Sequence, residues 1–466
     1  MLYIYKSKKF TMKIFKPTSF IICLLLSLFA VASDHKDKSV LDNDNNFSAE
    51  YKTKYTLVEN YIVSQKYLDA IPILLQLDSV TPLNPNIYYY LGICYLNSSN
   101  DKSKAIPYLE KASEKVSTTY KASYSENTAP IKTLYYLGKA YHISGRYEEA
   151  IKAFKAYKDK LPKKDPAIIT DVDSHILMCH NAIKLVKSPR NLKIELFNPD
   201  INTKNGDYSF AISSDKSILI FASDVLDNSR NNKTFKYNQE LYITAYNKKS
   251  RQWLRPAKIE SEIKSIATDN VFSTRSDTKE VFISKDYDDN KDLYSVTFKS
   301  NKTKGIIEWS DIQKVTGAVN TKANETNACL SPDGSTLYFV SDREGGLGGK
   351  DIWASDKLSD GSWGKPYNLG PKINTPFDEE SPFMLGDGAT LYYSSKGHNS
   401  MGGYDVFFTT LSDDGFWSES ENVGYPINTP TDDLYFVLTP DEKSAFYSSS
   451  KIDGIGDNDI YVVEFE

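Results

Sequence analysis

The stretch that decides the fold is Ser331-Pro332-Asp333-Gly334-Ser335-Thr336-Leu337-Tyr338-Phe339, a tight turn followed by an aromatic strand. The same arrangement returns at Asp387 and at Asp441, so the turn aspartates are 54 residues apart. Two weaker copies lie upstream, around Asp215 and Asp277. A period of this length with short aromatic strands is typical of a β-propeller. We therefore predict a propeller in the C-terminal part of the chain.

Each repeat has room for four strands, separated by turns rich in Gly, Asp and Pro. In the fourth repeat we expect strands at 381–385, 390–395 and 404–411 and one more after Trp417. The linker between repeats also recurs, with five copies near residues 202, 264, 320, 374 and 428. Most of these copies contain an Asn-Thr pair. The last repeat ends after its third strand. We predict that residues 191–197 supply the missing outer strand and close a ring of five blades.

Two kinds of residue recur once per repeat. The tryptophans are Trp253, Trp309, Trp363 and Trp417. The acids that open a strand are Glu240, Asp292, Asp351, Asp405 and Asp459. A residue that every blade needs is most simply structural. We therefore predict that the tryptophans pack between blades and that the acids cap strands through hydrogen bonds.

The loops between the second and third strands and between blades share one face of the ring, and they vary in length. Variable loops on a rigid scaffold are where binding usually occurs. The residues predicted to bind partners on this propeller face are Arg343, Lys350, Asp378, Glu379, His398 and Asp432.

The chain before the propeller has a helical period. Leu137-Gly138, Tyr141, Ala150, Phe154 and Pro162 have the spacing of a tetratricopeptide repeat, and two earlier copies are weaker. Small residues let two antiparallel helices approach closely. Residues 117–130 are an insertion between the second and third copies, and residues 165–187 are expected to form a capping helix. We predict an α + β multidomain chain, with an α-solenoid of tetratricopeptide repeats at 51–188 and a five-bladed antiparallel β-propeller at 189–466.

The concave face of such a solenoid is built from the first helix of each pair. Exposed aromatic residues beside lysine suit a peptide or an extended chain. The residues predicted to form this groove are Tyr55, Glu59, Tyr89, Ile93, Tyr135, Lys139 and His142.

The N-terminus predicts export. Five lysines precede an apolar run at 20–31, and a small-residue cleavage signal follows, so residues 1–32 are typical of a signal peptide. Met1 and Met12 are both candidate starts, and residues 33–50 are expected to be a flexible leader. The formal charge is −5 for the whole chain, and removing the five lysines leaves −10. A mildly acidic chain does not favour nucleic acid as a partner. We predict a periplasmic protein. This location is compatible with peripheral association with the outer membrane.

Residues 202–466 resemble the WD40-like repeats of the TolB type, through Ser331-Pro332-Asp333-Gly334 and Lys350-Asp351-Ile352-Trp353. A signal peptide, tetratricopeptide repeats and such a propeller together resemble a group of Gram-negative envelope proteins. An OmpA-like peptidoglycan-binding domain often follows in that group, and some members belong to the type IX secretion and gliding machinery. This sequence stops at the propeller, so we do not expect cell-wall anchoring. The resemblance implies a scaffold for envelope proteins that bind both repeat domains. It leaves the partners, the apparatus and the oligomeric state open.

Motifs for catalysis are not found in the sequence. There is no Gly-x-Ser-x-Gly elbow, phosphate loop or zinc-binding helix motif. Asp171, His175 and Cys179 share one helix face, but they span two turns, too far for one ion. Cys94, Cys179 and Cys329 are expected to be small buried residues. We predict no enzyme activity, cofactor or metal. Two alternatives remain open: a glycan-binding propeller, and a glycosidase with carboxylates around the central channel.

Overall fold

The computed structural model of this chain describes residues 47–98, 101–162, 165–198, 200–213, 216–226, 237–259, 280–287, 290–301, 306–309 and 312–465. The predicted signal peptide and most of the predicted leader lie outside these residues. So do the weak turns at Asp215 and Asp277 and the linker phase near residue 264.

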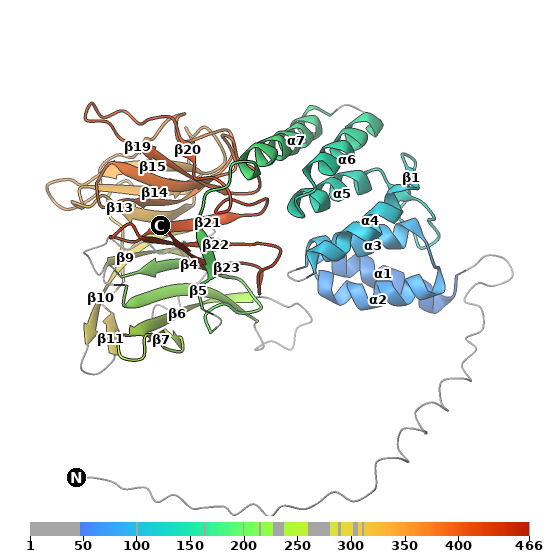
Figure 1. Ribbon diagram of the computed structural model, residues 1–466, viewed down its shortest axis with the longest axis horizontal. Helices are drawn as coiled ribbons and strands as arrows, with labels where there is room; N and C mark the ends of the chain where they lie inside the picture. The colour runs from blue at the N-terminus through green and yellow to red at the C-terminus, as the bar shows by residue number, and fades with distance from the viewer. Residues whose placement is uncertain are drawn as a thin grey trace, which may run out of the picture. The chain divides into compact units, whose positions relative to one another are not determined.

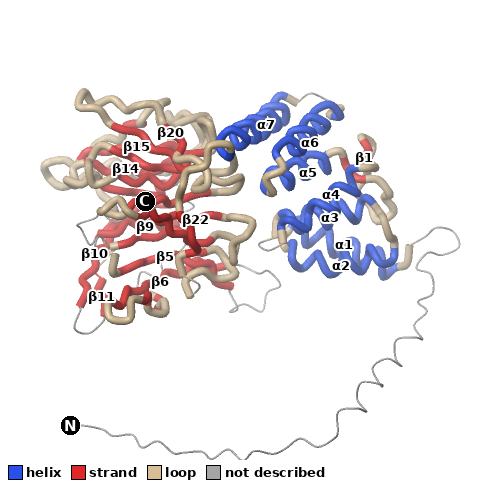
Figure 2. The backbone as a smooth tube through the Cα atoms, in the orientation of Figure 1, coloured by secondary structure: helices blue, strands red, loops and turns tan. Residues whose placement is uncertain are grey.

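The first part of the described chain is helical (Figures 1 and 2). Its α-helices are α1 (Ala49–Val63), α2 (Tyr67–Val80), α3 (Pro85–Leu96), α4 (Ala105–Ser113), α5 (Lys132–Ile143), α6 (Tyr147–Lys160) and α7 (Pro166–Val186). Polar caps define two of the starts: Asn84 Oδ1 accepts from the backbone N–H groups of Asn86 and Ile87, and Asp165 Oδ1 accepts from that of Ala167. Consecutive helices from α2 to α7 pack against each other.

Two glycines explain why neighbouring helices pack so closely. A Cβ atom on Gly138 of α5 would lie 2.7 Å from the ring of Phe154 on α6. A Cβ atom on Gly92 of α3 would collide with the side chain of Leu109 on α4. The prediction that small residues permit this approach is confirmed. Between α4 and α5, the insertion is tied at its ends by two short parallel strands, β1 (Val116–Ser117) and β2 (Ala129–Pro130).

The remaining described residues form five antiparallel sheets, one for each predicted blade. Blade 1 contains β4 (Asp207–Ile212), β5 (Ile218–Leu226), β6 (Tyr237–Asn247), β7 (Gln252–Trp253) and β8 (Ala257–Lys258). Blade 2 contains β9 (Glu280–Tyr287), β10 (Asn290–Asn301), β11 (Ile306–Trp309) and β12 (Gln313–Lys314). Blade 3 contains β13 (Glu325–Leu330), β14 (Thr336–Ser341), β15 (Asp351–Asp356) and β16 (Tyr367–Asn368). Blade 4 contains β17 (Glu379–Met384), β18 (Thr390–Ser395), β19 (Asp405–Thr410) and β20 (Glu421–Asn422). The five-bladed propeller is therefore confirmed.

Blade 5 is closed as predicted. It contains β21 (Asp433–Leu438), β22 (Ser444–Ser449) and β23 (Asp459–Glu464) from the end of the chain, and β3 (Lys193–Leu196) from the segment after α7. Strand β3 runs antiparallel to β23, with Leu196 opposite Tyr461 and Lys193 opposite Glu464. The segment 191–197 thus provides the outer strand of the last blade.

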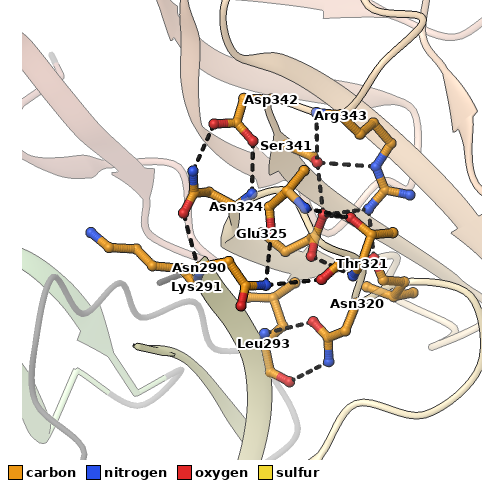
Figure 3. Close-up of polar contacts among 12 residues, drawn as sticks. Asn290, Lys291, Leu293, Asn320, Thr321, Asn324, Glu325, Ser341, Asp342 and Arg343 are labelled. Atoms are coloured by element: carbon orange, nitrogen blue, oxygen red, sulfur yellow. Dashed lines mark hydrogen bonds and ion pairs between the residues drawn. The ribbon is translucent and has the colours of Figure 1, made fainter. Parts of the chain in front are cut away.

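Each linker in the described residues contacts the blades on both sides of it, as Figure 3 shows for blades 2 and 3. The amide of Asn320 exchanges two hydrogen bonds with the backbone of Leu293 in blade 2, at 2.7 and 2.9 Å. The backbone N–H and the hydroxyl of Thr321 both donate to the carboxylate of Glu325 in blade 3, each at 2.7 Å. Ser341 donates to the same carboxylate at 2.9 Å. The same contacts recur around Asn202, Asn374 and Asn428. The repeated asparagine, threonine and acid are therefore structural.

Three of the five strand-opening acids, Asp351, Asp405 and Asp459, also act as predicted, whereas Glu240 and Asp292 pair with lysines. Asp351 accepts hydrogen bonds from the backbone N–H groups of Leu347 and Gly348, and Asp405 accepts one from Met401. Trp417 contacts the Tyr338 ring of the neighbouring blade, with ring centroids 6.4 Å apart, which confirms its packing role. Cys94, Cys179 and Cys329 are buried free thiols, as expected. No helix in the described part of the chain is long and apolar enough to span a membrane.

Candidate functional site

A cleft of about 870 Å³ lies between helices α5 and α7 and the loops of blades 4 and 5. Lys139 and His142 of the predicted groove line it, and so does Asp432 of the predicted propeller face. Two surfaces that the sequence suggested were separate therefore contribute to one cleft. Phe377, which precedes β17 and is 40% exposed, adds an apolar wall.

The blade 4 loop between β18 and β19 is held by the helices. The Nδ2 group of Asn181 on α7 donates to the carbonyl oxygen of Ser400 at 3.0 Å. The Nε2 atom of His142 on α5 lies 2.8 Å from the carbonyl oxygen of Met401, and since a carbonyl can only accept, Nε2 carries the proton. The Met401 side chain is fully buried among residues of α5, α6 and α7, including Tyr147 and Phe154. This loop forms the base of the cleft.

His142 is a neutral histidine at pH 7. Its side chain is almost completely buried, and this burial lowers its pKa to about 4, although the hydrogen bond to Met401 opposes the shift. The neighbouring His175 and Lys139 lower the pKa a little further. His142 was predicted to lie in an exposed groove. It instead joins the helices to the propeller, because the blade 4 loop covers it.

This burial predicts a specific pH dependence. Between pH 6.5 and about 4 the unfolded chain binds a proton at His142 and the folded chain does not, so the free energy of unfolding falls as the pH falls through this window. The full contribution is about 3 kcal/mol. His142→Gln should remove it, whereas His180→Gln, at an exposed position of α7, should not. Urea unfolding from pH 7.5 to 5 tests this prediction. It is contradicted if the free energy of unfolding of the His142→Gln variant changes with pH as steeply as that of the unaltered chain.

His175 lies on α7 at the edge of the cleft. Its ring stacks on Phe154, with centroids 5.2 Å apart, and its Nε2 atom lies 3.0 Å from the hydroxyl of Tyr135. Its Nδ1 atom is buried without a hydrogen-bond partner among the described residues. Burial lowers the pKa of His175, while Asp171, 3.8 Å away, opposes the shift. The ring therefore presents an unsatisfied polar atom beside the cleft.

Lys139 lines the cleft and has no ion pair within the described part of the chain. Its Nζ atom lies 5.9 Å from the centre of the Tyr135 ring. Burial lowers the pKa of Lys139, and the charges of Asp171 and Asp432 oppose this shift. An ammonium group with incomplete solvation and no direct counter-ion is suited to contact a polar or anionic group of a bound partner.

The other predicted groove residues are less accessible than expected. Tyr55 and Ile93 are buried, at 2% and 6% exposure, and Glu59 and Tyr89 are half-buried. Burial raises the pKa of Glu59 and of Tyr89. The hydroxyl of Tyr55 accepts from Asn86 of α3, and its ring packs edge to face on Tyr90 of the same helix. The prediction that Tyr55, Ile93 and His142 are exposed groove residues is therefore wrong.

The predicted propeller-face residues are mostly bound to the propeller itself. Glu379 is fully buried and accepts from Thr375 and Ser395, so its assignment to a binding face is wrong. Arg343 donates to Glu325 at 2.9 Å and lies over the Phe339 and Trp353 rings.

The remaining members of that set lie nearer the surface. His398 contacts the Tyr393 hydroxyl and the carbonyl oxygen of Ile373, so its ring is also held in place. Lys350 pairs with Glu380 at 2.5 Å, and Asp378 pairs with Lys396 at 2.9 Å. Asp432 lines the cleft and accepts from the backbone N–H of Tyr404.

Sequence reasoning did not identify Met401 and Asn181. A signal for Met401 was present, because Leu347, Met401 and Ile455 occupy the same loop position, four residues before a capping acid. The N–H groups of Met401 and Ile455 donate to Asp405 and Asp459 at 2.9 and 2.7 Å. Nothing in the repeat shows which of these apolar residues a helix covers. No cluster of His, Cys, Asp or Glu suited to a metal ion occurs in the described ranges, and Cys179 is buried in the helical core.

Comparison with known proteins gives no family. No protein-family model matches the sequence, and no curated protein matches it. Solved structures that match include TolB from Acinetobacter baumannii, with 14% identity over 63% of this chain and 70% of that chain and a TM-score of 0.33. An alpha-L-arabinofuranosidase from Lactobacillus brevis matches with 13% identity over 57% of this chain and 91% of that chain and a TM-score of 0.37. The GH62 alpha-L-arabinofuranosidase catalytic domain from Coprinopsis cinerea has 10% identity, covering 59% and 98%, and a TM-score of 0.37. Likenesses this distant do not bear on function.

Proposed function

We propose that this chain is a non-enzymatic interaction scaffold of the periplasm, which binds an envelope protein in the cleft between its helices and its propeller. The observation that carries the proposal is the composition of the cleft. Apolar side chains such as Phe377 and Ile143 lie beside the charged side chains of Lys139, Asp171 and Asp432. An apolar centre with a charged rim is the usual anatomy of a protein-binding surface.

The proposal includes two points that rest on the sequence. The helices are tetratricopeptide repeats, supported by the matching spacing of Gly92 and Gly138 and by their equivalent close contacts with the next helix. The protein is exported, supported by the signal-peptide pattern at 1–32, and peripheral outer-membrane association follows if the partner is an outer-membrane protein.

The recurring acids do not favour a glycosidase. Such an enzyme needs two accessible carboxyl groups on either side of a sugar. Glu325, Glu379, Asp351 and Asp405 instead accept hydrogen bonds that hold blades and loops together. Their recurrence is thus explained by their structural role, and a scaffold remains the better-supported proposal.

Site-specific photo-cross-linking tests the scaffold proposal. A photoreactive amino acid at Phe377 should give protein adducts in envelope preparations, and Lys139→Ala with Asp171→Ala should reduce them. The matched control position is Phe416, which is 72% exposed on a short turn between β19 and β20, outside the cleft. Equal adducts at both positions would reject the cleft as the binding site. Retention of the purified protein by envelope polysaccharide, lost in the cleft variant, would favour the glycan-binding alternative.

A further inference from the structure

Three blades place a nitrogen-bearing side chain against a backbone carbonyl of the linker that precedes the blade. These side chains and the carbonyls that they contact are Arg343 and Val319 in blade 3, His398 and Ile373 in blade 4, and Lys451 and Pro426 in blade 5. Each side chain follows the end of the second strand of its blade by two or three residues. This position therefore ties the linker to the sheet.

The side chain at this position also lies over two aromatic rings, which are opposite each other on the second and third strands. In blade 3, the guanidinium of Arg343 lies 4.9 Å from the centre of the Phe339 ring and 5.3 Å from that of the Trp353 ring. The corresponding residues of blade 5 are Lys451, Tyr447 and Tyr461. A cation is attracted to the electron-rich faces of such rings.

Arg343 has two further acceptors in blade 3. Its Nε group donates to the hydroxyl of Ser341 at 3.0 Å, and its Nη2 group donates to the carboxylate of Glu325 at 2.9 Å. Glu325 is fully buried, and the charge of Arg343 opposes the rise in pKa that this burial causes. Blade 3 thus contains a complete guanidinium site, made of a linker carbonyl, a serine, a buried acid and two rings.

Blade 1 repeats this site except for the arginine. By position in the repeat, the counterparts of Val319, Glu325, Phe339, Ser341 and Trp353 are Ile201, Asp207, Phe221, Ser223 and Tyr242. The counterpart of Arg343 is Val225. Phe221 and Tyr242 are opposite each other on β5 and β6, with ring centroids 5.7 Å apart. The same acceptors and rings are therefore present without the side chain that they hold in blade 3.

A pocket of about 220 Å³ lies at this place in blade 1. Its lining includes Ile201, Thr203, Phe221, Ser223, Val225 and Tyr242. Asp200 and Arg255 also line it and are exposed, so the pocket opens to solvent. Its volume is below the roughly 300–1,000 Å³ of pockets for drug-sized ligands, so it suits one small group.

The acid of blade 1 lies beside this pocket. Ser223 is opposite Asp207 in the β4–β5 ladder, and the N–H of Thr203 donates to Oδ2 of Asp207 at 2.5 Å. Asp207 is fully buried, and its Oδ1 atom has no hydrogen-bond partner among the described residues. Burial raises the pKa of Asp207 to about 6. A buried carboxylate oxygen without a donor is costly, and a cationic donor would satisfy it.

The residue types of the pocket favour a guanidinium over an ammonium group. Blades 1 and 3 both have a phenylalanine, Phe221 and Phe339, as the ring on the second strand. In blade 5 this ring is Tyr447, and the Nζ group of Lys451 donates to its hydroxyl at 2.6 Å. Blade 1 lacks this hydroxyl. A forked guanidinium can instead donate to a serine, an acid and a carbonyl at once, as it does in blade 3.

We propose that the blade 1 pocket binds a guanidinium group from outside the propeller. The group lies over Phe221 and Tyr242 and donates to Asp207 and Ser223, as Arg343 does to their counterparts. An arginine side chain of a bound protein and a free guanidino compound both carry this group, and the first source rests on the proposed function. The pocket shares no lining residue with the cleft, so failure of this proposal and failure of the cross-linking test are distinguishable.

The probe is acetyl-arginine amide, and its binding to the full-length chain is followed by saturation-transfer NMR. We expect a dissociation constant on the order of 1 mM, because a single group makes few contacts. Acetyl-citrulline amide has nearly the same shape without the charge, and should bind at least ~10-fold more weakly. Val225→Arg supplies the pocket with a guanidinium of the chain itself and should also weaken binding at least ~10-fold. The matched control is Leu347→Arg, which adds the same charge at an exposed position of blade 3.

Agmatine, which carries the guanidinium without a peptide backbone, distinguishes the two sources. Binding of agmatine and of acetyl-arginine amide with similar affinity supports an arginine of a bound protein. Binding of agmatine that is at least ~10-fold tighter supports a free guanidino compound, because the backbone of the other probe then hinders entry.

Three results would overturn the proposal: equal binding of the arginine and citrulline probes, binding that Val225→Arg leaves unchanged, or binding that appears only in an Arg255→Ala variant. The last result would mean that Arg255 itself supplies the group. If Val225→Arg does not fold, Ser223→Ala provides the second measurement. Loss of this acceptor should weaken binding at least ~3-fold, whereas Ser341→Ala, the same change in blade 3, should leave it unaltered. Equal effects of the two serine variants would show that the probe does not bind in blade 1.

Discussion

Replacing the four residues of β3, Lys193–Leu196, by proline is expected to abolish the cooperative unfolding of the propeller. Proline cannot donate to a strand ladder, so β23 would lose its outer partner and expose an open edge. The lost ladder and the partly buried side chains of Ile194 and Leu196 together contribute about 5 kcal/mol. This is comparable with the whole stability of many domains. Thermal unfolding followed by circular dichroism measures the effect.

The control for this experiment changes the side chains of β3 and keeps its backbone. Lys193 and Glu195 are exposed and form surface ion pairs, which contribute little to stability. Lys193→Ser with Glu195→Ser should therefore unfold almost as the unaltered chain does. A proline variant that melts at the same temperature and with the same cooperativity would show that β3 does not close the ring.

Met401→Ala is expected to lower the free energy of unfolding by about 3 kcal/mol and to loosen the helices from blade 4. The Met401 side chain is fully buried in the core of α5, α6 and α7, and its truncation leaves a cavity there. The weakened contact should also expose the segment between α7 and β3, where the N–H of Arg190 donates to the carbonyl oxygen of Tyr425. Urea unfolding gives the energy, and the rate of trypsin cleavage at Lys187 and Arg190 reports the loosening.

The propeller supplies a matched control for Met401. Leu347 has the same place in the blade 3 loop, and its N–H donates to Asp351 as that of Met401 does to Asp405. Its side chain is 46% exposed, so Leu347→Ala should change the free energy of unfolding by less than about 0.5 kcal/mol. Equal effects of the two substitutions would mean that burial of Met401 between the helices does not stabilise the protein.

The sequence was informative where every repeat needs the same residue for the same local reason. Asp351 and Asp405 cap a loop within their own blade, and residues within four positions of them supply the donors. The glycines of the helices meet the next helix in the chain. Closure of the last blade was also predictable. The last repeat lacks an outer strand, and the segment before the first repeat can pair with its third strand. Patterns of this kind are local or periodic, and both can be read along the chain.

The candidate sites depended on contacts between segments far apart in the chain. His142 and Lys139 both line the cleft from α5, yet the blade 4 loop, some 260 residues later, buries the ring of His142, while Lys139 stays half-buried. Tyr55 of α1 is buried against Asn86 and Tyr90 of α3, some 30 residues later. The sequence by itself determined the five blades and their closure, because these follow from local turns and periodic packing. Only the tertiary structure decided which apolar or aromatic side chains remain accessible, because burial depends on long-range packing that no repeat period encodes.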